Sequence, residues 1–134
     1  MKLEVGMRVS VTNLITEKMI DDFAQISGDT NPLHLDDEYA KESIFGQRVA
    51  HGMIGASFIS SVLGNKMPGH GSIYLRSDLK FLNPIFIGDS VETICELIDI
   101  NKKKKILYVE CVCKVKERIA IQGLATLKKE NLNG

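Results

Sequence analysis

Residues 51–64 read HGMIGASFISSVLG, a stretch that carries no formal charge apart from a possible histidinium at its start. Drawn as a helix, it presents apolar or small side chains in every direction, and a helix of that kind has to be buried. Gly52, Gly55 and Ala56 have little bulk, so a sheet can wrap closely around the helix and leave space for a ligand along one side. Gly64 is predicted to end the helix as its C-terminal cap. The sequence thus predicts a central, buried helix.

Beyond this segment the hydrophobic period changes to two. Ile73, Leu75 and Phe81 alternate with polar residues, which predicts a strand with one face buried. Three more strands follow, and one is expected ahead of the helix, so that the expected strands cover residues 3–12, 72–81, 91–100, 106–115 and 119–127. The lysines at 102–105 are interpreted as a solvated turn rather than an anion-binding patch. An antiparallel sheet curled around the helix would bury both apolar surfaces, which predicts an α+β fold.

Length and composition limit the domain count and the partners. The 134 residues, 44% of them hydrophobic, suffice for one domain with a core and are too few for two. We expect a single domain over 1–134, with an ordered core over 1–128 and a loose tail over 129–134. Lysine plus arginine, 17, equals aspartate plus glutamate, 17, so no overall field attracts nucleic acid or an anionic membrane. The expected partner is a small molecule or a second copy of the chain.

The cysteines and the apolar segments bear on the compartment. The sequence contains neither a signal-peptide core nor an apolar run long enough to cross a bilayer, which favours the cytoplasm. Cys95, Cys111 and Cys113 stand among valines and isoleucines without a CxxC motif. We interpret them as small buried hydrophobic residues and expect no metal or redox role for them.

Residues 27–35 read SGDTNPLHL and are predicted to form a fixed, irregular loop that is neither helix nor strand. Gly28 can take the left-handed conformation that ends a helix, while Pro32 lacks a backbone donor and keeps Asn31 out of the helical region. Two short helices are expected on either side of the loop, over residues 16–27 and from 36 or 37 to about 43.

This loop carries a carboxylate, Asp29, and an imidazole, His34. On a continuous helix the two side chains would be roughly 140° apart, at about 100° per residue, so only a break lets them converge. Taken singly, Asp29 is explained as a turn residue and His34 as a structural histidine. Paired in such a loop, they favour acid–base catalysis.

Taken together, these segments resemble the MaoC-like hot-dog dehydratases, and specifically the single-domain (R)-specific enoyl-CoA hydratases. The resemblance extends from about residue 16 to residue 115 and rests on FAQISGDTNPLH at 23–34, AHGM at 50–53, GSIY at 71–74 and PIFIGD at 84–89. It implies a hot-dog domain that acts as a homodimer. The implied reaction is the reversible hydration of trans-2-enoyl-CoA, or of the same thioester on an acyl carrier protein, to the (R)-3-hydroxyacyl product. Neither a metal nor a redox cofactor is implied.

The resemblance also assigns roles to individual residues. Asp29 and His34 would hold one water molecule and pass its proton to the substrate, and the amide of Gly52, at the positive end of the helix, would stabilise the enolate oxygen. His51 is expected to orient the structure. The remaining candidates are Asn31 and Ser60 for positioning the water or the substrate, and Ala56 and Leu63 for the acyl pocket.

Two other functions stay open. A hot-dog thioesterase would attack C1 instead of C3 on much the same fold. Thioesterases of this architecture usually place a carboxylate on the buried helix, and residues 51–64 contain none. A non-catalytic acyl-CoA-binding regulator would need an output module, for which this chain has no room and no basic face.

Overall fold

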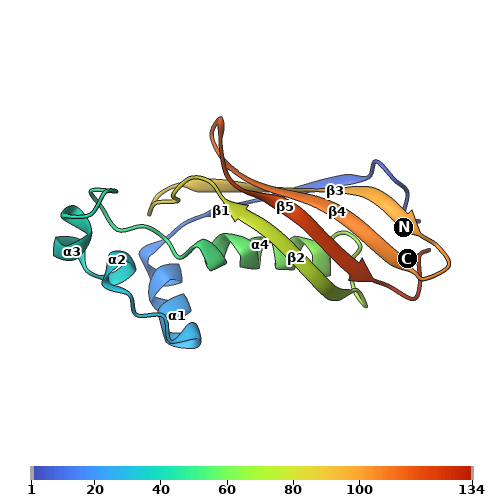
Figure 1. The fold of residues 1–134 in the computed structure, drawn as a ribbon, viewed down its shortest axis with the longest axis horizontal. Helices are drawn as coiled ribbons and strands as arrows, with labels where there is room; N and C mark the ends of the chain where they lie inside the picture. The colour runs from blue at the N-terminus through green and yellow to red at the C-terminus, as the bar shows by residue number, and fades with distance from the viewer. Residues whose placement is uncertain (1, 134) are drawn as a thin grey trace.

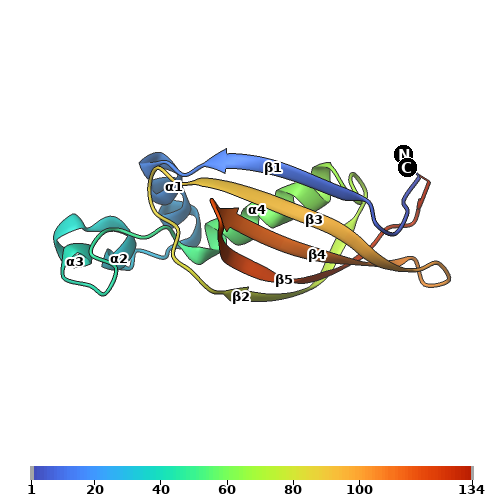
Figure 2. The ribbon, with the colours of Figure 1, turned by 90° about the horizontal axis from the view of Figure 1, so that it is seen from above.

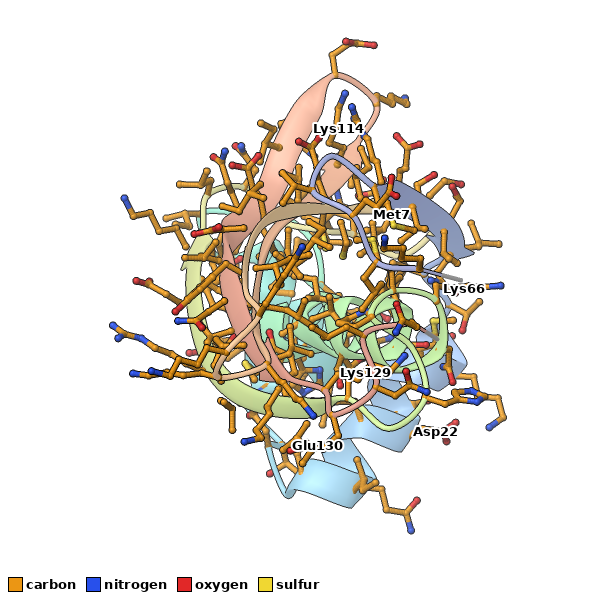
Figure 3. The ribbon with its side chains drawn as sticks, turned by 90° about the vertical axis from the view of Figure 1, so that its right-hand side faces the viewer. Met7, Asp22, Lys66, Lys114, Lys129 and Glu130 are labelled. Carbon is orange, nitrogen blue, oxygen red and sulfur yellow. The ribbon has the colours of Figure 1, made fainter. Side chains whose placement is uncertain are left out.

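The computed structural model describes residues 2–133 and consists of one curved sheet with a long helix across one of its faces (Figure 1). The sheet is antiparallel, and its strands lie in the order β1, β3, β4, β5, β2. Their bounds are β1 (Arg8–Leu14), β2 (Ile73–Phe81), β3 (Ser90–Asn101), β4 (Ile106–Val115) and β5 (Arg118–Lys128). The helix is α4 (Gly52–Asn65), and the sheet curves around it when the molecule is viewed from its end (Figure 3). The predicted α+β hot-dog class is confirmed.

Three short helices gather at one end of the sheet, near the start of α4 (Figures 1 and 2). Thr16 caps the first by accepting a hydrogen bond from the amide of Met19 at 3.2 Å, and Gly28, at φ 78°, ends it as predicted. The third ends slightly earlier than expected. Their bounds are α1 (Glu17–Ser27), α2 (Pro32–Leu35) and α3 (Asp37–Lys41).

Helix α2 lies inside the segment that was expected to be irregular throughout, so that expectation was wrong for its last four residues. Pro32 occupies the first helical position, where its missing amide hydrogen is not needed. Asn31 caps the turn, its Oδ1 accepting a hydrogen bond from the amide of Leu33 at 3.0 Å. The predicted break between α1 and α2 is present, and it bends the chain between Asp29 and His34.

The core lies between α4 and the inward faces of the central strands. Alternate residues of β3 and β4 are fully buried, as the period of two indicated. From α4, Ile59 and Leu63 pack into this layer with no exposed surface. Burying a side chain of that size contributes roughly 2 kcal/mol to folding, so α4 is held by packing rather than by helix propensity. The thiols of Cys95, Cys111 and Cys113 are buried in the same layer, as predicted.

Two expectations for α4 were wrong. The helix continues through Gly64 to Asn65, and Lys66 is its C-terminal cap. It is also covered on one side only, because a single sheet reaches one face of a helix. Met53, Ser57, Ser60 and Ser61 lie on the uncovered face, and the side chain of Met53 is 58% exposed.

Strand β2 also departs from the prediction that one of its faces is buried. It is an edge strand, paired only with β5, and Ile73, Leu75 and Phe81 are 56%, 52% and 51% exposed. A register shift between Tyr74 and Arg76 also sends Ile73 and Phe81 to opposite faces of the sheet, so the alternating pattern does not correspond to one buried face.

The structure differs from the expectation near both ends of the described chain. Strand β1 begins at Arg8 instead of residue 3, because Gly6, at φ 98°, turns the chain, and Leu3 is buried and bonds to Leu132 through its amide. Within the expected loose tail, two residues contact the rest of the chain: Lys129 is 6% exposed, and its Nζ donates to the carbonyl of Pro68 at 2.8 Å, while the carbonyl of Leu132 accepts the bond from Leu3. Residue 134 lies outside the described part. Within residues 2–133, no helix has the length and apolar character needed to cross a membrane.

Candidate active site

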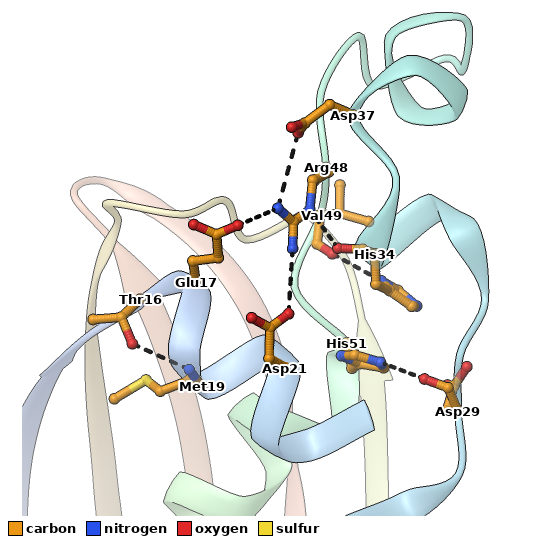
Figure 4. A network of polar contacts seen from close by, with 10 residues as sticks. All are labelled: Thr16, Glu17, Met19, Asp21, Asp29, His34, Asp37, Arg48, Val49 and His51. Carbon is orange, nitrogen blue, oxygen red and sulfur yellow. Dashed lines mark hydrogen bonds and ion pairs between the residues drawn. The ribbon is translucent and has the colours of Figure 1, made fainter. Parts of the chain in front are cut away.

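Asp29 and His34 converge, and His51 joins them. One carboxylate or imidazole atom from each of the three side chains lies within 4.8 Å of the others. Asp29 precedes α2, His34 belongs to α2, and His51 is the residue before α4 (Figure 4). Three segments that are separate in the sequence thus bring an acid and two imidazoles to the N-terminus of the central helix.

The carboxylate of Asp29 is exposed and held by its own turn. Its Oδ1 accepts a hydrogen bond from the amide of Asn31 at 3.2 Å, and the amide of Asp29 donates to Oγ of Ser27 at 3.0 Å. Short polar side chains commonly fix turns in this way. One carboxylate oxygen is engaged in the turn, which leaves the second for a ligand.

The ring of His34 is oriented by a backbone carbonyl. Its Nδ1 lies 2.8 Å from the carbonyl oxygen of Val49, which can only accept, so Nδ1 carries a proton. In the neutral imidazole the lone pair is therefore on Nε2. A histidine held in this tautomer can take a proton through Nε2.

Arg48 fastens the backbone of His34, and sequence reasoning missed it. Its side chain is 7% exposed, and its Nε donates to the carbonyl of His34 at 2.7 Å. Its Nη1 pairs with Glu17 at 2.9 Å, while Asp21 and Asp37 lie at 3.8 and 3.9 Å (Figure 4). One guanidinium thereby links α1, α2 and α3. A lone arginine in a loop gives no signal of partners so far away in the sequence.

His51 is buried, with 3% of its surface exposed. Its ring is stacked between Phe23, at a centroid distance of 4.8 Å, and His34, at 3.9 Å. Its Nε2 donates to the backbone carbonyl of Asp29 at 3.0 Å. The residue that was expected only to orient the structure contacts both members of the predicted pair.

Beside these groups lies an open cavity of about 340 Å³. His34 and Gly52 line it together with apolar side chains that include Leu33, Phe45 and Ile121. Gly52 is the first residue of α4, so its amide has no acceptor within the helix and lies at the positive end of the helix dipole. The cavity therefore combines an apolar wall, an imidazole and a free amide.

Of the predicted site residues, only His34 and Gly52 line this cavity, and Asp29 lies next to His34 outside its lining. Asn31 caps α2, and Ser60 lies exposed on the uncovered face of α4. Leu63 is fully buried in the core, and Ala56 is half-buried. Their assignment to water, substrate or acyl chain stays a prediction.

The site geometry bears on metal binding and on nucleophilic thiols. The three side chains form a cluster of possible metal ligands, but Nε2 of His51 already donates to the carbonyl of Asp29 and its Nδ1 is buried, which leaves Asp29 and His34 as the accessible groups. The thiols lie in the core, where burial raises the pKa of Cys113 to about 11, and where the contact with Cys95 together with burial raises the pKa of Cys111. They are not available as nucleophiles.

Known proteins with similar sequences and structures carry related names. The model of the MaoC like domain matches residues 2–118. An (R)-specific enoyl-CoA hydratase from Rhodospirillum rubrum is 39% identical over 125 residues, which cover 93% of this chain and 87% of that protein. A 3-hydroxybutyryl-CoA dehydratase from Methylorubrum extorquens is 36% identical and covers 94% of this chain and 80% of its own length. The solved structure of the (R)-hydratase from A. caviae, 35% identical, matches with a TM-score of 0.91 over 95% of this chain and 97% of that one.

Proposed function

The chain belongs to the MaoC-like domain family, and from this membership we propose that it hydrates trans-2-enoyl-CoA reversibly to (R)-3-hydroxyacyl-CoA. The observation that carries the proposal is the convergence of Asp29 and His34 beside an apolar cavity and the free amide of Gly52. Hydration of an enoyl thioester needs these parts: a group to deprotonate water, a proton for C2 and a donor for the enolate oxygen.

In the proposed mechanism, Asp29 and His34 hold one water molecule between the free carboxylate oxygen and Nε2. The water oxygen bonds to C3 as the π bond between C2 and C3 breaks, and the water proton passes to the pair. A proton from the pair then bonds to C2, so the elements of one water molecule are added. Because the same pair takes up the water proton and returns one to C2, hydroxyl and hydrogen are expected to add to one face of the double bond.

Gly52 is proposed to bind the thioester oxygen. Negative charge develops on this oxygen as the nucleophile adds to C3, and an amide at a helix N-terminus stabilises such charge. Water addition is redox-neutral overall, and we propose that it proceeds here without a metal or redox cofactor. The substrate thioester itself brings the coenzyme A.

We further propose that the protein works as a homodimer in the cytoplasm. The exposed apolar residues of β2 and the uncovered face of α4 support a second copy as the partner. The neighbouring thiols of Cys95 and Cys111, with Sγ atoms 3.8 Å apart, suit a reducing compartment. An acyl carrier protein would present the same thioester, and comparing kcat/KM for crotonyl groups on the two carriers decides between them.

The reaction is tested by mixing the protein with crotonyl-CoA and following the enoyl-thioester absorbance together with free thiol. Loss of absorbance without thiol release supports hydration. Thiol release would instead identify a thioesterase. If neither signal changes, the protein is a non-catalytic binding protein. The product configuration is read by a coupled assay with an (R)-specific dehydrogenase.

The same assay tests the two residues. Asp29→Asn and His34→Ala should each lower kcat by about 10²- to 10⁴-fold, the usual contribution of a positioned acid or base. Asp22→Asn and His70→Ala change an exposed carboxylate and an exposed imidazole outside the site and should leave kcat within about two-fold. A site variant with activity close to that of its control would reject that residue as the acid or base.

A further inference from the structure

We propose that His51 is a positioning residue that holds Asp29, His34 and Gly52 in register, an inference that rests on the hydratase function proposed above. Among residues 2–133 it is the one side chain that both donates a hydrogen bond to Asp29 and stacks on the ring of His34, and it directly precedes Gly52 in the chain. Its own atoms need take no part in the proton transfers.

The two contacts of His51 fix different parts of the site geometry: the position of the Asp29 turn and the plane of the His34 ring. The hydrogen bond from Nε2 to the carbonyl of Asp29, at 3.0 Å, sets how far the turn of Asp29 stands from the start of α4. The stack on His34, at 3.9 Å, sets the plane in which that ring can lie. The hydrogen bond from Nδ1 of His34 to Val49 already fixes the rotation of the ring within its plane. This bond and the stack on His51 together fix the direction in which Nε2 of His34 points.

The remaining ring nitrogen separates a positioning role from a packing role. Nδ1 of His51 is buried and has no hydrogen-bond partner among residues 2–133. A buried, unpartnered nitrogen costs free energy, whereas a phenylalanine would fill the same sandwich without this cost. For packing alone, histidine is the poorer choice at position 51. What it adds over phenylalanine is the hydrogen bond to Asp29.

Replacing His51 with Phe should therefore change stability and activity in opposite directions. His51→Phe keeps the stack and removes the unpartnered nitrogen along with the bond to Asp29. It should lower kcat for crotonyl-CoA hydration by about 100-fold, the usual result of displacing a reacting group by an ångström, while KM changes less than about three-fold. Its melting temperature should equal or exceed that of the wild type. A merely structural residue would lose stability and activity together.

A second variant separates the two contacts. His51→Gln places an amide nitrogen where Nε2 stood, so it can bond to the carbonyl of Asp29 but not stack on His34. The kcat of His51→Gln should be at least about ten-fold higher than that of His51→Phe, even though the melting temperature of His51→Gln should be lower. His70→Phe, at an exposed histidine outside the site, is the matched control and should change neither quantity.

The outcomes distinguish this inference from the proposed function. If the wild type hydrates crotonyl-CoA and His51→Phe keeps kcat within about three-fold, His51 does not position the site, and the hydratase function stands. The inference also fails if His51→Phe loses kcat only in proportion to its loss of folded protein, or if His51→Gln recovers nothing. If the wild type shows no hydration at all, both the function and the inference fall.

Discussion

At the scale of single residues, the most consequential side chain outside the predicted site is Arg48. It is a buried cation whose acidic partners, Glu17, Asp21 and Asp37, are themselves exposed. Solvent screens those ion pairs, so the number of ion pairs is a poor measure of how much Arg48 contributes to the stability of the fold. Its bond from Nε to the carbonyl of His34 is the shortest of its contacts and the one that reaches the site.

Replacing Arg48 with Met should therefore lower the free energy of unfolding by about 2 kcal/mol, the range for a lost hydrogen bond to a charged group. Urea unfolding followed by circular dichroism measures this change. Lys18→Met is the control, because the Lys18–Asp22 pair is exposed at 82% and 61% and should contribute less than about 0.5 kcal/mol. Equal losses in the two variants would show that burial of Arg48 adds nothing.

Cys113 gives a prediction about pH. Burial raises the pKa of its thiol from 9.0 to about 11. Below pH 9 both the folded and the unfolded thiol are protonated, so stability from this group is unaffected there. As the pH rises from about 9 to about 11, the unfolded thiol ionises first, and the free energy of unfolding should fall by about 2 to 3 kcal/mol.

Urea unfolding between pH 8 and pH 11 checks this result. Cys113→Ala lacks the ionising group, so its loss of stability over the same interval should be smaller by that amount. A wild type and a variant with parallel pH curves would mean that the buried thiol ionises as easily as a free one.

At the scale of elements, glycines show where strands and helices approach most closely. Gly123 on β5 lies against the backbone of β2, and a Cβ there would collide with the carbonyl oxygen of Asp78. Gly64 lies within α4, and a Cβ there would meet open space. The same substitution should thus have opposite effects at these two positions.

Gly123→Ala should destabilise the protein by about 1 to 3 kcal/mol, because the two strands must separate to admit a methyl group. Gly64→Ala should stabilise it by about 0.5 to 1 kcal/mol through higher helix propensity. Thermal unfolding measures both, and hydrogen exchange should show faster opening of β2 in Gly123→Ala. A neutral Gly123→Ala would mean that β2 moves aside freely.

The elements also show what could be predicted from the sequence. The periods of two and the charge-free stretch identified the sheet and α4, because burial of apolar surface depends on short-range pattern. The convergence of Asp29 and His34 followed from the break between α1 and α2. The contacts of Arg48 and His51 could not be predicted, because they join segments whose proximity only the packed fold creates. The expected burial of β2 failed because a sequence pattern does not say whether another element of the same chain covers a face.

At the scale of the whole molecule, the uncovered surface lies on one side. The edge strand β2 and the exposed face of α4 both belong to this side, which carries Met53 and Phe81, and Leu75 lies at the bulge of the same edge strand. A dimer formed through this side would bury apolar surface and pair an open strand edge.

Sedimentation equilibrium should thus give twice the mass of one chain for the wild type. Leu75→Lys places a charge on β2 and should shift the protein towards the mass of one chain. Ile98→Lys adds the same charge at an exposed position on β3, which β4 and β5 separate from β2, and should leave the dimer intact. Dissociation by both variants, or by neither, would place the contact elsewhere.

The position of Phe81 has one more consequence. Its ring lies close against Gly52, where an added Cβ would sit 2.8 Å from it, while about half of the ring remains open to solvent. If a second copy covers that ring, the copy also braces the first turn of α4 from outside. Turnover per chain should then depend on how concentrated the enzyme is: it should decline as a stock is diluted into the range where protomers part, and return when the stock is reconcentrated.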